Sequence, residues 1–294
     1  MLTGANGQVG WELARSLLPI GEVVSLTRQQ CDLSRPETLP CIVQEIEPDV
    51  VVNAAAYTAV DRAEEEEHLA TIINGTAVGV LAEAARKRNA LFIHYSTDYV
   101  FDGTKVGAYT EEDEPSPINA YGCSKLVGEE AVRHVGGDHL VFRTSWVYAA
   151  RSNNFVRTIL RLGKERDELK VVADQFGAPT SAELIADVTA LVLSGIAMDP
   201  SQREKVSGTY HLTAAGRTSW YGYTKLIMEV AETNGYPLRV SSDKVIPINT
   251  DDFPRPAKRP LNSQLDTANL KSIFDIRIPL WEGYVRRCVT EIVL

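Results

Sequence analysis

Short apolar, β-branched runs alternate with helix-length stretches through the first half of the chain, and this alternation limits the possible folds more than any other feature. The expected strands are residues 23–26, 50–53, 91–96 and 139–143. The expected helices between them are residues 9–18, 36–45, 59–88 and 120–135. Strands that alternate with helices in this way form parallel sheets covered by helices on both faces. The sequence therefore predicts an α/β fold built on a doubly wound parallel sheet of the Rossmann type.

The pattern changes after Arg143. The expected elements are then helices at 153–164, 182–193 and 219–233 and strands at 170–172 and 208–212. Four prolines between residues 247 and 260 exclude that segment from the interior of a regular sheet. We interpret residues 1–145 plus about 181–212 as a dinucleotide-binding domain. Residues from about 146 to 180 plus 213–294 are interpreted as a smaller α+β lobe that binds the substrate.

Composition excludes several classes of protein. The 294 residues are 44% hydrophobic and 23% charged, as in an ordinary globular protein. Because the net charge is −9, binding to nucleic acid or to an anionic membrane is not expected. The four cysteines have neither zinc-site nor disulfide-framework spacing. With no signal-peptide pattern and no run of about 18 apolar residues, a cytoplasmic protein is expected.

A glycine-rich turn opens the chain. Gly4, Gly7 and Gly10 form a G-x-x-G-x-x-G pattern that leads directly into the first expected helix. Such glycines let the backbone approach a pyrophosphate, which the helix N-terminus then stabilises. Only Met1, Leu2 and Thr3 precede Gly4, so either the sequence lacks several N-terminal residues or the first strand is unusually short.

A Tyr-x-x-x-Lys pair lies in the expected helix 120–135. Tyr121 and Lys125 share one helix face at this spacing. The lysine cation is expected to lower the phenol pKa from about 10, so that the tyrosine exchanges a proton near neutrality. Thr97 follows the expected strand 91–96, at the sheet edge where such folds bind ligands. Its hydroxyl is placed to polarise a substrate carbonyl.

In this order, the glycine turn, Thr97 and the Tyr121/Lys125 pair resemble the extended short-chain dehydrogenase/reductase family, in its nucleotide-sugar branch. Further stretches along the whole chain are similar to the reductases of that branch that act on dTDP-4-dehydrorhamnose. These stretches are residues 53–61, 96–101, 143–148, 153–155, 174–180 and 259–263.

The resemblance implies an enzyme that reduces the C4 ketone of dTDP-4-dehydro-β-L-rhamnose to dTDP-L-rhamnose with NADPH, NADH being possible. It implies that Tyr121 protonates the developing alkoxide while hydride leaves the nicotinamide. Lys125 would hold the nicotinamide ribose and tune Tyr121. Thr97 would donate a hydrogen bond to the ketone oxygen, which stabilises negative charge in the transition state.

The same resemblance, together with the glycine turn, assigns binding residues. For the cofactor these are Gly4, Gly7, Gln8, Val9, Gly10, Asp32, Leu33, Ala56, Tyr57, Thr58, Tyr95, Tyr121 and Lys125. For the sugar nucleotide they are Thr97, Asp98, Trp146, Asn154 and Arg259. Glu12, Glu183 and Glu291 would bind Mg²⁺ at the contact of a homodimer. The simpler alternatives are a core position for Trp146 and solvated helix surfaces for the three glutamates.

Arg28 predicts a preference for NADPH over NADH. The second strand ends in Thr27–Arg28 without the acid that accepts hydrogen bonds from both ribose hydroxyls. A guanidinium there pairs with a 2′-phosphate. Asp32 is the competing residue. We set it aside because it lies beyond the strand end and, in the resembled family, faces the adenine.

Three other functions compete with reduction of the sugar. A 4,6-dehydratase is disfavoured because Tyr99 stands where an acid would follow Thr97–Asp98. Another nucleotide-sugar epimerase or reductase stays open. A different class of protein is a non-catalytic NADP-binding regulatory subunit, like the β subunit of methionine adenosyltransferase. Because Thr97, Tyr121 and Lys125 are all present, we favour the enzyme.

Overall fold

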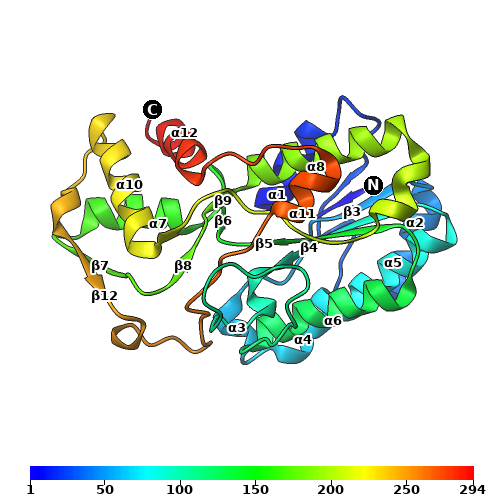
Figure 1. The fold of residues 1–294 in the computed structure, drawn as a ribbon, viewed down its shortest axis with the longest axis horizontal. Coiled ribbons are helices and arrows are strands. Elements are labelled where there is room, and N and C mark those ends of the chain that lie inside the picture. The colour runs from blue at the N-terminus through cyan, green and yellow to red at the C-terminus, as the bar shows by residue number, and fades with distance from the viewer.

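A six-stranded parallel sheet forms the centre of the computed structural model, which describes residues 1–199 and 201–294 with their side chains (Figure 1). Its strands are β1 (Leu2–Thr3), β2 (Ser25–Leu26), β3 (Val50–Asn53), β4 (Leu91–Thr97), β5 (His139–Thr144) and β10 (Gly208–His211). Their order is β10-β5-β4-β3-β1-β2, and every neighbouring pair is parallel. The chain therefore winds outward in both directions from β1 and β3, which confirms the doubly wound α/β fold. Such sheets bind ligands at the carboxyl ends of the strands where the winding reverses.

Helices cover both faces of this sheet (Figure 1). One face carries α1 (Gln8–Ser16) and α8 (Ala182–Met198), and the other carries α2 (Leu39–Ile46), α5 (Ala77–Lys87) and α6 (Ala120–Val135). Successive residues of β4 point to opposite faces. Leu91 and Ile93 join the core under α1 and α8, whereas Phe92 joins the core under α2 and α5. This alternation explains why the strand begins with three apolar residues, Leu91, Phe92 and Ile93.

The prediction of a single helix over residues 59–88 is wrong. The structure has α3 (Val60–Ala63), α4 (Glu67–Thr71), a π-helical turn (Ile72–Thr76) and then α5. A Cβ added at Gly75, within the π turn, would lie 2.7 Å from the Val127 side chain of α6, so the glycine permits close helix packing. Residues 67–87 are long and apolar enough to span a membrane by length and composition, but 56% of that stretch is buried inside the fold, as in a core helix.

The remaining elements lie beside one end of the sheet (Figure 1). They include α7 (Phe155–Glu165), β7 (Leu169–Val172), α10 (Trp220–Thr233), β12 (Val245–Ile248) and α12 (Trp281–Val293). Helix α11 (Ala268–Phe274) instead packs against β10 of the sheet. Helix α10 packs against α7, β7, β12 and α12. Pro247 lies in β12, which pairs only with β7, so its missing N–H leaves no broken ladder inside a larger sheet. The sequence patterns did not predict α11; they placed Glu291 on a helix without giving its bounds, and α12 confirms that helix.

Short strands connect these elements to the sheet. β6 (Val147–Tyr148) pairs with β9 (Thr180–Ser181), and β8 (Phe176–Gly177) pairs with β11 (Thr218–Ser219). Each has only two residues. Because a two-residue strand carries no periodic pattern, none of the four was predicted from the sequence.

Candidate active site

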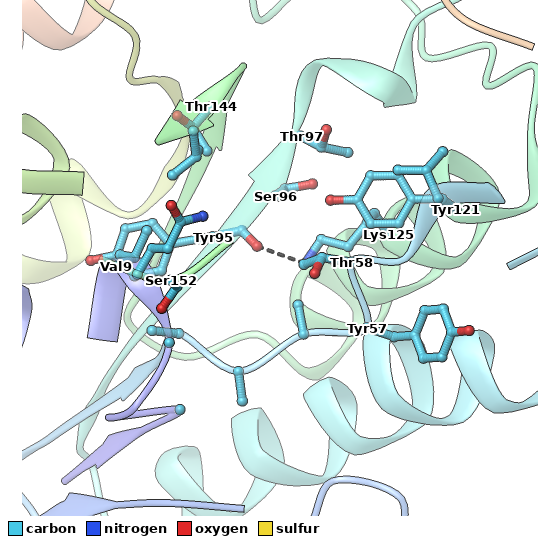
Figure 2. Close-up of a pocket in the computed structure, with 18 of the residues that line it drawn as sticks. Val9, Tyr57, Thr58, Tyr95, Ser96, Thr97, Tyr121, Lys125, Thr144 and Ser152 are labelled. Carbon is cyan, nitrogen blue, oxygen red and sulfur yellow. Dashed lines mark hydrogen bonds between the residues drawn. The ribbon is translucent and has the colours of Figure 1, made fainter. Parts of the chain in front are cut away.

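A cavity of about 910 Å³ lies at the carboxyl ends of the central strands (Figure 2). Most of the predicted site residues line it together. They are Gly4, Gly7, Gln8, Val9, Arg28, Asp32, Leu33, Ala56, Tyr57, Thr58, Tyr95, Thr97, Asp98, Tyr121, Lys125, Trp146 and Asn154. Gly10, Arg259 and the three predicted metal ligands lie outside the lining.

The glycine turn forms one end of this cavity and fits a pyrophosphate. Gly4 has φ +68°, and a Cβ there would lie 2.7 Å from the backbone nitrogen of Ala55. A Cβ at Gly10 would lie 2.1 Å from the Gly4 carbonyl oxygen, so this glycine lets α1 start directly against the turn. No side chain caps α1 at Gly7, and its first N–H groups therefore face the cavity as an anion site.

Arg28 and Asp32 lie side by side beyond the glycine turn. Arg28 Nε is 3.6 Å from Asp32 Oδ1, and the arginine side chain is 73% exposed. Burial opposes ionisation of Asp32, but hydrogen bonds from Ser34 and the charge of Arg28 hold its pKa below the usual value. The two residues considered for recognition of the adenosine ribose therefore both line the cavity, where they form an ion pair.

Lys125 is buried between β4 and α6. Its Nζ donates to the Tyr95 carbonyl oxygen at 2.6 Å (Figure 2) and lies 3.1 Å from His94 Nε2. Only 1% of the lysine is exposed. Burial lowers the pKa of its ammonium to about 7, against the field of Glu129 one turn further along α6.

The Tyr121 hydroxyl points into the cavity beside Thr97 (Figure 2). Burial raises the pKa of Tyr121 to about 12, and a hydrogen bond with the Thr97 hydroxyl opposes the rise. The expected lowering of this pKa by Lys125 is therefore wrong, because the lysine bonds to Tyr95 and His94 instead. The phenol stays protonated at neutral pH, which is the form that a proton donor needs.

Asp98 lines the cavity, but its carboxylate is buried. The residue is 2% exposed, and its Oδ1 accepts a hydrogen bond from Thr97 Oγ1 at 3.1 Å. Its Oδ2 is shielded from solvent and has no partner at hydrogen-bond distance among the described residues, although Ser263 is near enough to lower the pKa of the carboxyl. Burial raises the pKa of this carboxyl to about 6. A buried acceptor without a partner is costly, so a ligand hydroxyl that donated to it would stabilise the site.

Arg259 lies near the cavity but does not line it. Its Nη2 donates to Asp61 Oδ1 at 2.9 Å, and its guanidinium lies 5.9 Å from the centre of the Tyr99 ring. Tyr99 lines the cavity and Arg259 does not. Contact of Arg259 with the substrate therefore stays a prediction.

The predicted magnesium ligands do not form a metal site within the chain. Burial raises the pKa of Glu183, and the nearby charges of Glu12 and Glu291 raise it further. Arginines neutralise two of the three: Arg287 lies 3.3 Å from Glu183 and Arg15 lies 3.5 Å from Glu12. Within the part of the chain that the structure describes, no group of three His, Cys, Asp or Glu residues is arranged to hold a metal.

Asn74 positions the cavity wall and was missed from the sequence. From the π turn its Oδ1 accepts from the Tyr57 N–H at 2.8 Å, and its Nδ2 donates to the Tyr57 carbonyl and to Ser124 Oγ, both at 2.9 Å. These bonds tie the loop after β3 to helix α6. A buried asparagine inside an apolar helical run was the available signal, because such a residue must find partners.

Trp220 is a second cavity residue that the sequence did not single out. It stacks on Trp146 with ring centroids 3.7 Å apart and planes 14° apart. Its Nε1 donates to Gln175 Oε1 at 3.1 Å. The two residues lie 74 positions apart in the chain, so no local pattern links them. Trp146 is therefore not a simple core residue. Together with Trp220 it forms an aromatic part of the cavity wall.

Comparisons with known proteins agree with this geometry. The family model described as the RmlD substrate binding domain matches residues 1–294. A dTDP-4-dehydrorhamnose reductase of Burkholderia thailandensis is 55% identical over 294 residues, which covers 99% of this chain and 98% of the relative. The chain belongs to the dTDP-4-dehydrorhamnose reductase family.

Solved structures of the dTDP-4-dehydrorhamnose reductase family have the same fold as this chain. The one from Clostridium acetobutylicum is 38% identical, has a TM-score of 0.90 and is matched over 100% of this chain and 99% of its own. The one from Bacillus anthracis, in complex with NADP, is 35% identical, has a TM-score of 0.86 and is matched over 99% and 98%.

Proposed function

We propose that this chain reduces the C4 ketone of dTDP-4-dehydro-β-L-rhamnose to give dTDP-L-rhamnose, with NADPH as the reductant. One observation carries the proposal. A phenol and a hydroxyl converge at Tyr121 and Thr97, beside the buried carboxyl of Asp98, at the far end of a cavity that begins at a pyrophosphate-type glycine turn. The relatives named above carry the name of this activity.

Thr97, Tyr121 and Asp98 each have a separate role in the proposed reaction. When bound, the nicotinamide supplies the hydride that adds to C4. Thr97 and Tyr121 place two hydroxyls at the ketone oxygen, where negative charge develops. The O–H bond of Tyr121 then breaks as a new O–H bond forms on the C4 oxygen, and the phenolate regains its proton from solvent. Asp98 Oδ2 accepts from a sugar hydroxyl and thereby fixes the orientation of the ring.

The dinucleotide is proposed to lie along the cavity from Arg28 to Lys125. Its pyrophosphate would meet the N-terminus of α1. Arg28 would leave Asp32 to pair with the 2′-phosphate, and Lys125 would hold the nicotinamide ribose. The exposed side chain of Arg28 supports this assignment, because little packing is lost when it turns.

Association of two copies is a further part of the proposal, drawn from the family resemblance. Glu12, Glu183 and Glu291 lie on α1, α8 and α12 and act electrostatically on one another. We propose that Mg²⁺ binds these carboxylates only where two copies meet. Sedimentation with and without chelator tests this: a dimer unaffected by chelator and by Glu183→Ala contradicts it. We also propose that the protein is cytoplasmic.

Oxidation of NADPH in the presence of dTDP-4-dehydrorhamnose tests the main proposal. Stoichiometric oxidation with formation of dTDP-L-rhamnose is expected. A regulatory subunit would bind the dinucleotide without turnover, and an epimerase would show no net consumption of NADPH. Tyr121→Phe should abolish most of the activity. Tyr236→Phe, which alters a tyrosine that packs under Lys164 outside the cavity, is the matched control.

A further inference from the structure

Asn119 lies just before helix α6, and both ends of its side-chain amide are hydrogen-bonded. The residue is 5% exposed. Its Oδ1 accepts from the Gly122 N–H at 2.8 Å, and its Nδ2 donates to the Lys258 carbonyl oxygen at 2.8 Å. Because a backbone N–H can only donate and a carbonyl oxygen can only accept, both partners require the same orientation of the amide.

The first bond helps to fix the position of Tyr121. Asn119 is the N-cap of α6, and Tyr121 is the second residue of that helix. The first turn packs closely on the residues after β4, since a Cβ at Gly122 would lie 2.2 Å from the Tyr99 carbonyl oxygen. Without the cap, N–H groups of this turn lose their acceptor and the turn frays more easily. The cap therefore holds the Tyr121 phenol beside Thr97.

The second bond reaches residues 255–263, which we call the bridging segment. Asp61 on α3 accepts from Arg259 Nη2 of this segment at 2.9 Å. At the other end of the segment, the Ser263 N–H donates to the carbonyl oxygen of Phe176 on β8 at 2.7 Å. The bridging segment is thus held between α3, the start of α6 and β8.

The bridging segment lies close to the cavity wall at two points. The Arg259 guanidinium is 5.9 Å from the centre of the Tyr99 ring, and that ring packs edge-on against Tyr121 with centroids 5.6 Å apart. Ser263 is near enough to Asp98 to lower the pKa of its carboxyl. A shift of the segment relative to α6 would therefore displace the side chains at this end of the cavity.

Both bonds together explain why the capping residue is an asparagine. Asparagine, aspartate and serine cap helices about equally well. Only the amide has an acceptor for the helix and a separate N–H donor for a second carbonyl. An aspartate at this position would set a carboxylate oxygen against the Lys258 carbonyl, and a serine has a single oxygen, which the cap occupies. Capping alone accounts for one of the two bonds.

We propose that Asn119 is a positioning residue that couples the bridging segment to helix α6: its Oδ1 holds Tyr121 in place, and its Nδ2 holds the segment beside the bound sugar nucleotide. The inference rests on the proposed function for its kinetic test. The two bonds predict separate effects. Loss of the donor raises KM for the sugar nucleotide, whereas loss of the cap lowers kcat. Binding of NADPH at the glycine turn is unaffected by either.

Hydrogen exchange without substrate tests the coupling itself. Asn119→Asp keeps the capping oxygen and removes the donor, and Asn119→Ala removes both. In Asn119→Asp the N–H groups of residues 257–263 should exchange about tenfold faster than in wild type, while those of residues 122–125 keep their protection. In Asn119→Ala both stretches should exchange faster. Asn119→Ser, which caps without a charge, should match Asn119→Asp. Unchanged exchange at residues 257–263 in these variants overturns the proposal.

The kinetic arm uses oxidation of NADPH with dTDP-4-dehydrorhamnose. In Asn119→Asp and Asn119→Ser, KM for the sugar nucleotide should rise about tenfold, with kcat and the Kd of NADPH within about twofold of wild type. In Asn119→Ala, kcat should fall as well. Asn89→Asp adds the same charge at an exposed position outside the cavity and should leave all three unchanged.

A fall in kcat at unchanged KM in Asn119→Asp and Asn119→Ser overturns the proposal, because it assigns only the cap to Asn119. If the exchange results hold but the wild-type protein does not oxidise NADPH, the proposed function fails and the coupling by Asn119 stands.

Discussion

Replacing Asp98 by asparagine should make the protein more stable, although the residue lies in the candidate active site. Burial raises the pKa of this carboxyl from 3.8 to about 6, which corresponds to about 3 kcal/mol of free energy. At pH 8 the folded protein therefore carries a buried charge that the unfolded chain holds in water. An asparagine side chain keeps the shape and the bond from Thr97. Its unpartnered NH₂ costs about 1 kcal/mol, so a net gain of about 2 kcal/mol is expected.

The pH dependence of this gain in the free energy of unfolding identifies its cause. Because the folded-state pKa lies above the unfolded one, the protonated carboxyl contributes stability at low pH, and that contribution is lost as the pH rises through about 6. The advantage of Asp98→Asn should therefore shrink by about 1.4 kcal/mol between pH 8 and pH 5. This difference does not depend on how well the asparagine packs.

Urea unfolding of wild type and Asp98→Asn at pH 5 and pH 8 measures both quantities. Asp251→Asn, at an exposed aspartate, is the matched control and should change stability by less than about 0.5 kcal/mol. Turnover of the sugar nucleotide by Asp98→Asn should fall, since the acceptor for the sugar hydroxyl is replaced. A variant that is no more stable than wild type at pH 8, or one with an equal advantage at both pH values, would refute the reasoning.

Four further substitutions test other parts of the site. Tyr121→Phe should lower kcat by about 10²–10⁴-fold and leave NADPH binding intact in a fluorescence titration. Lys125→Ala should reduce both kcat and affinity for NADPH, measured in the same two assays. Arg28→Ala should lower the ratio of kcat/KM for NADPH to that for NADH by about 10- to 100-fold; an unchanged ratio removes Arg28 from phosphate recognition. Gly10→Ala should abolish NADPH binding because its Cβ would lie 2.1 Å from the Gly4 carbonyl oxygen, whereas Gly283→Ala, with no atom within 4 Å, should bind normally.

Local patterns in the sequence were sufficient for the sheet and for most of the cavity. The strands around Val51 and Phe92 are buried on both faces, so their apolar runs stand out from the helices beside them. The glycine turn could be identified because its backbone geometry admits no side chain at Gly4 or Gly10. Tyr121 and Lys125 line one cavity because a spacing of four residues places side chains on one helix face.

Features that depend on distant partners were not predictable in this way. The expected helix 59–88 is interrupted at residues 64–66, and from Glu67 it continues through a π turn in which Asn74 bonds to the backbone of Tyr57 and to Ser124 on α6. Trp146 is held by a stack on Trp220. The predicted magnesium site does not form within one chain, and arginines pair with two of the glutamates: Arg15 from the same helix as Glu12, and Arg287, which is distant in sequence from Glu183.

The sequence by itself thus determined the main strands of the sheet, most of the helices that cover it and which side chains face the same edge of the sheet, since helix and strand periodicities act between residues close in the chain. Only the tertiary structure decided how those side chains ionise. Burial raises the pKa of Tyr121 to about 12 and lowers that of Lys125 to about 7. Protonation depends on solvent exclusion and on partners brought together by folding, and neither can be deduced from local spacing.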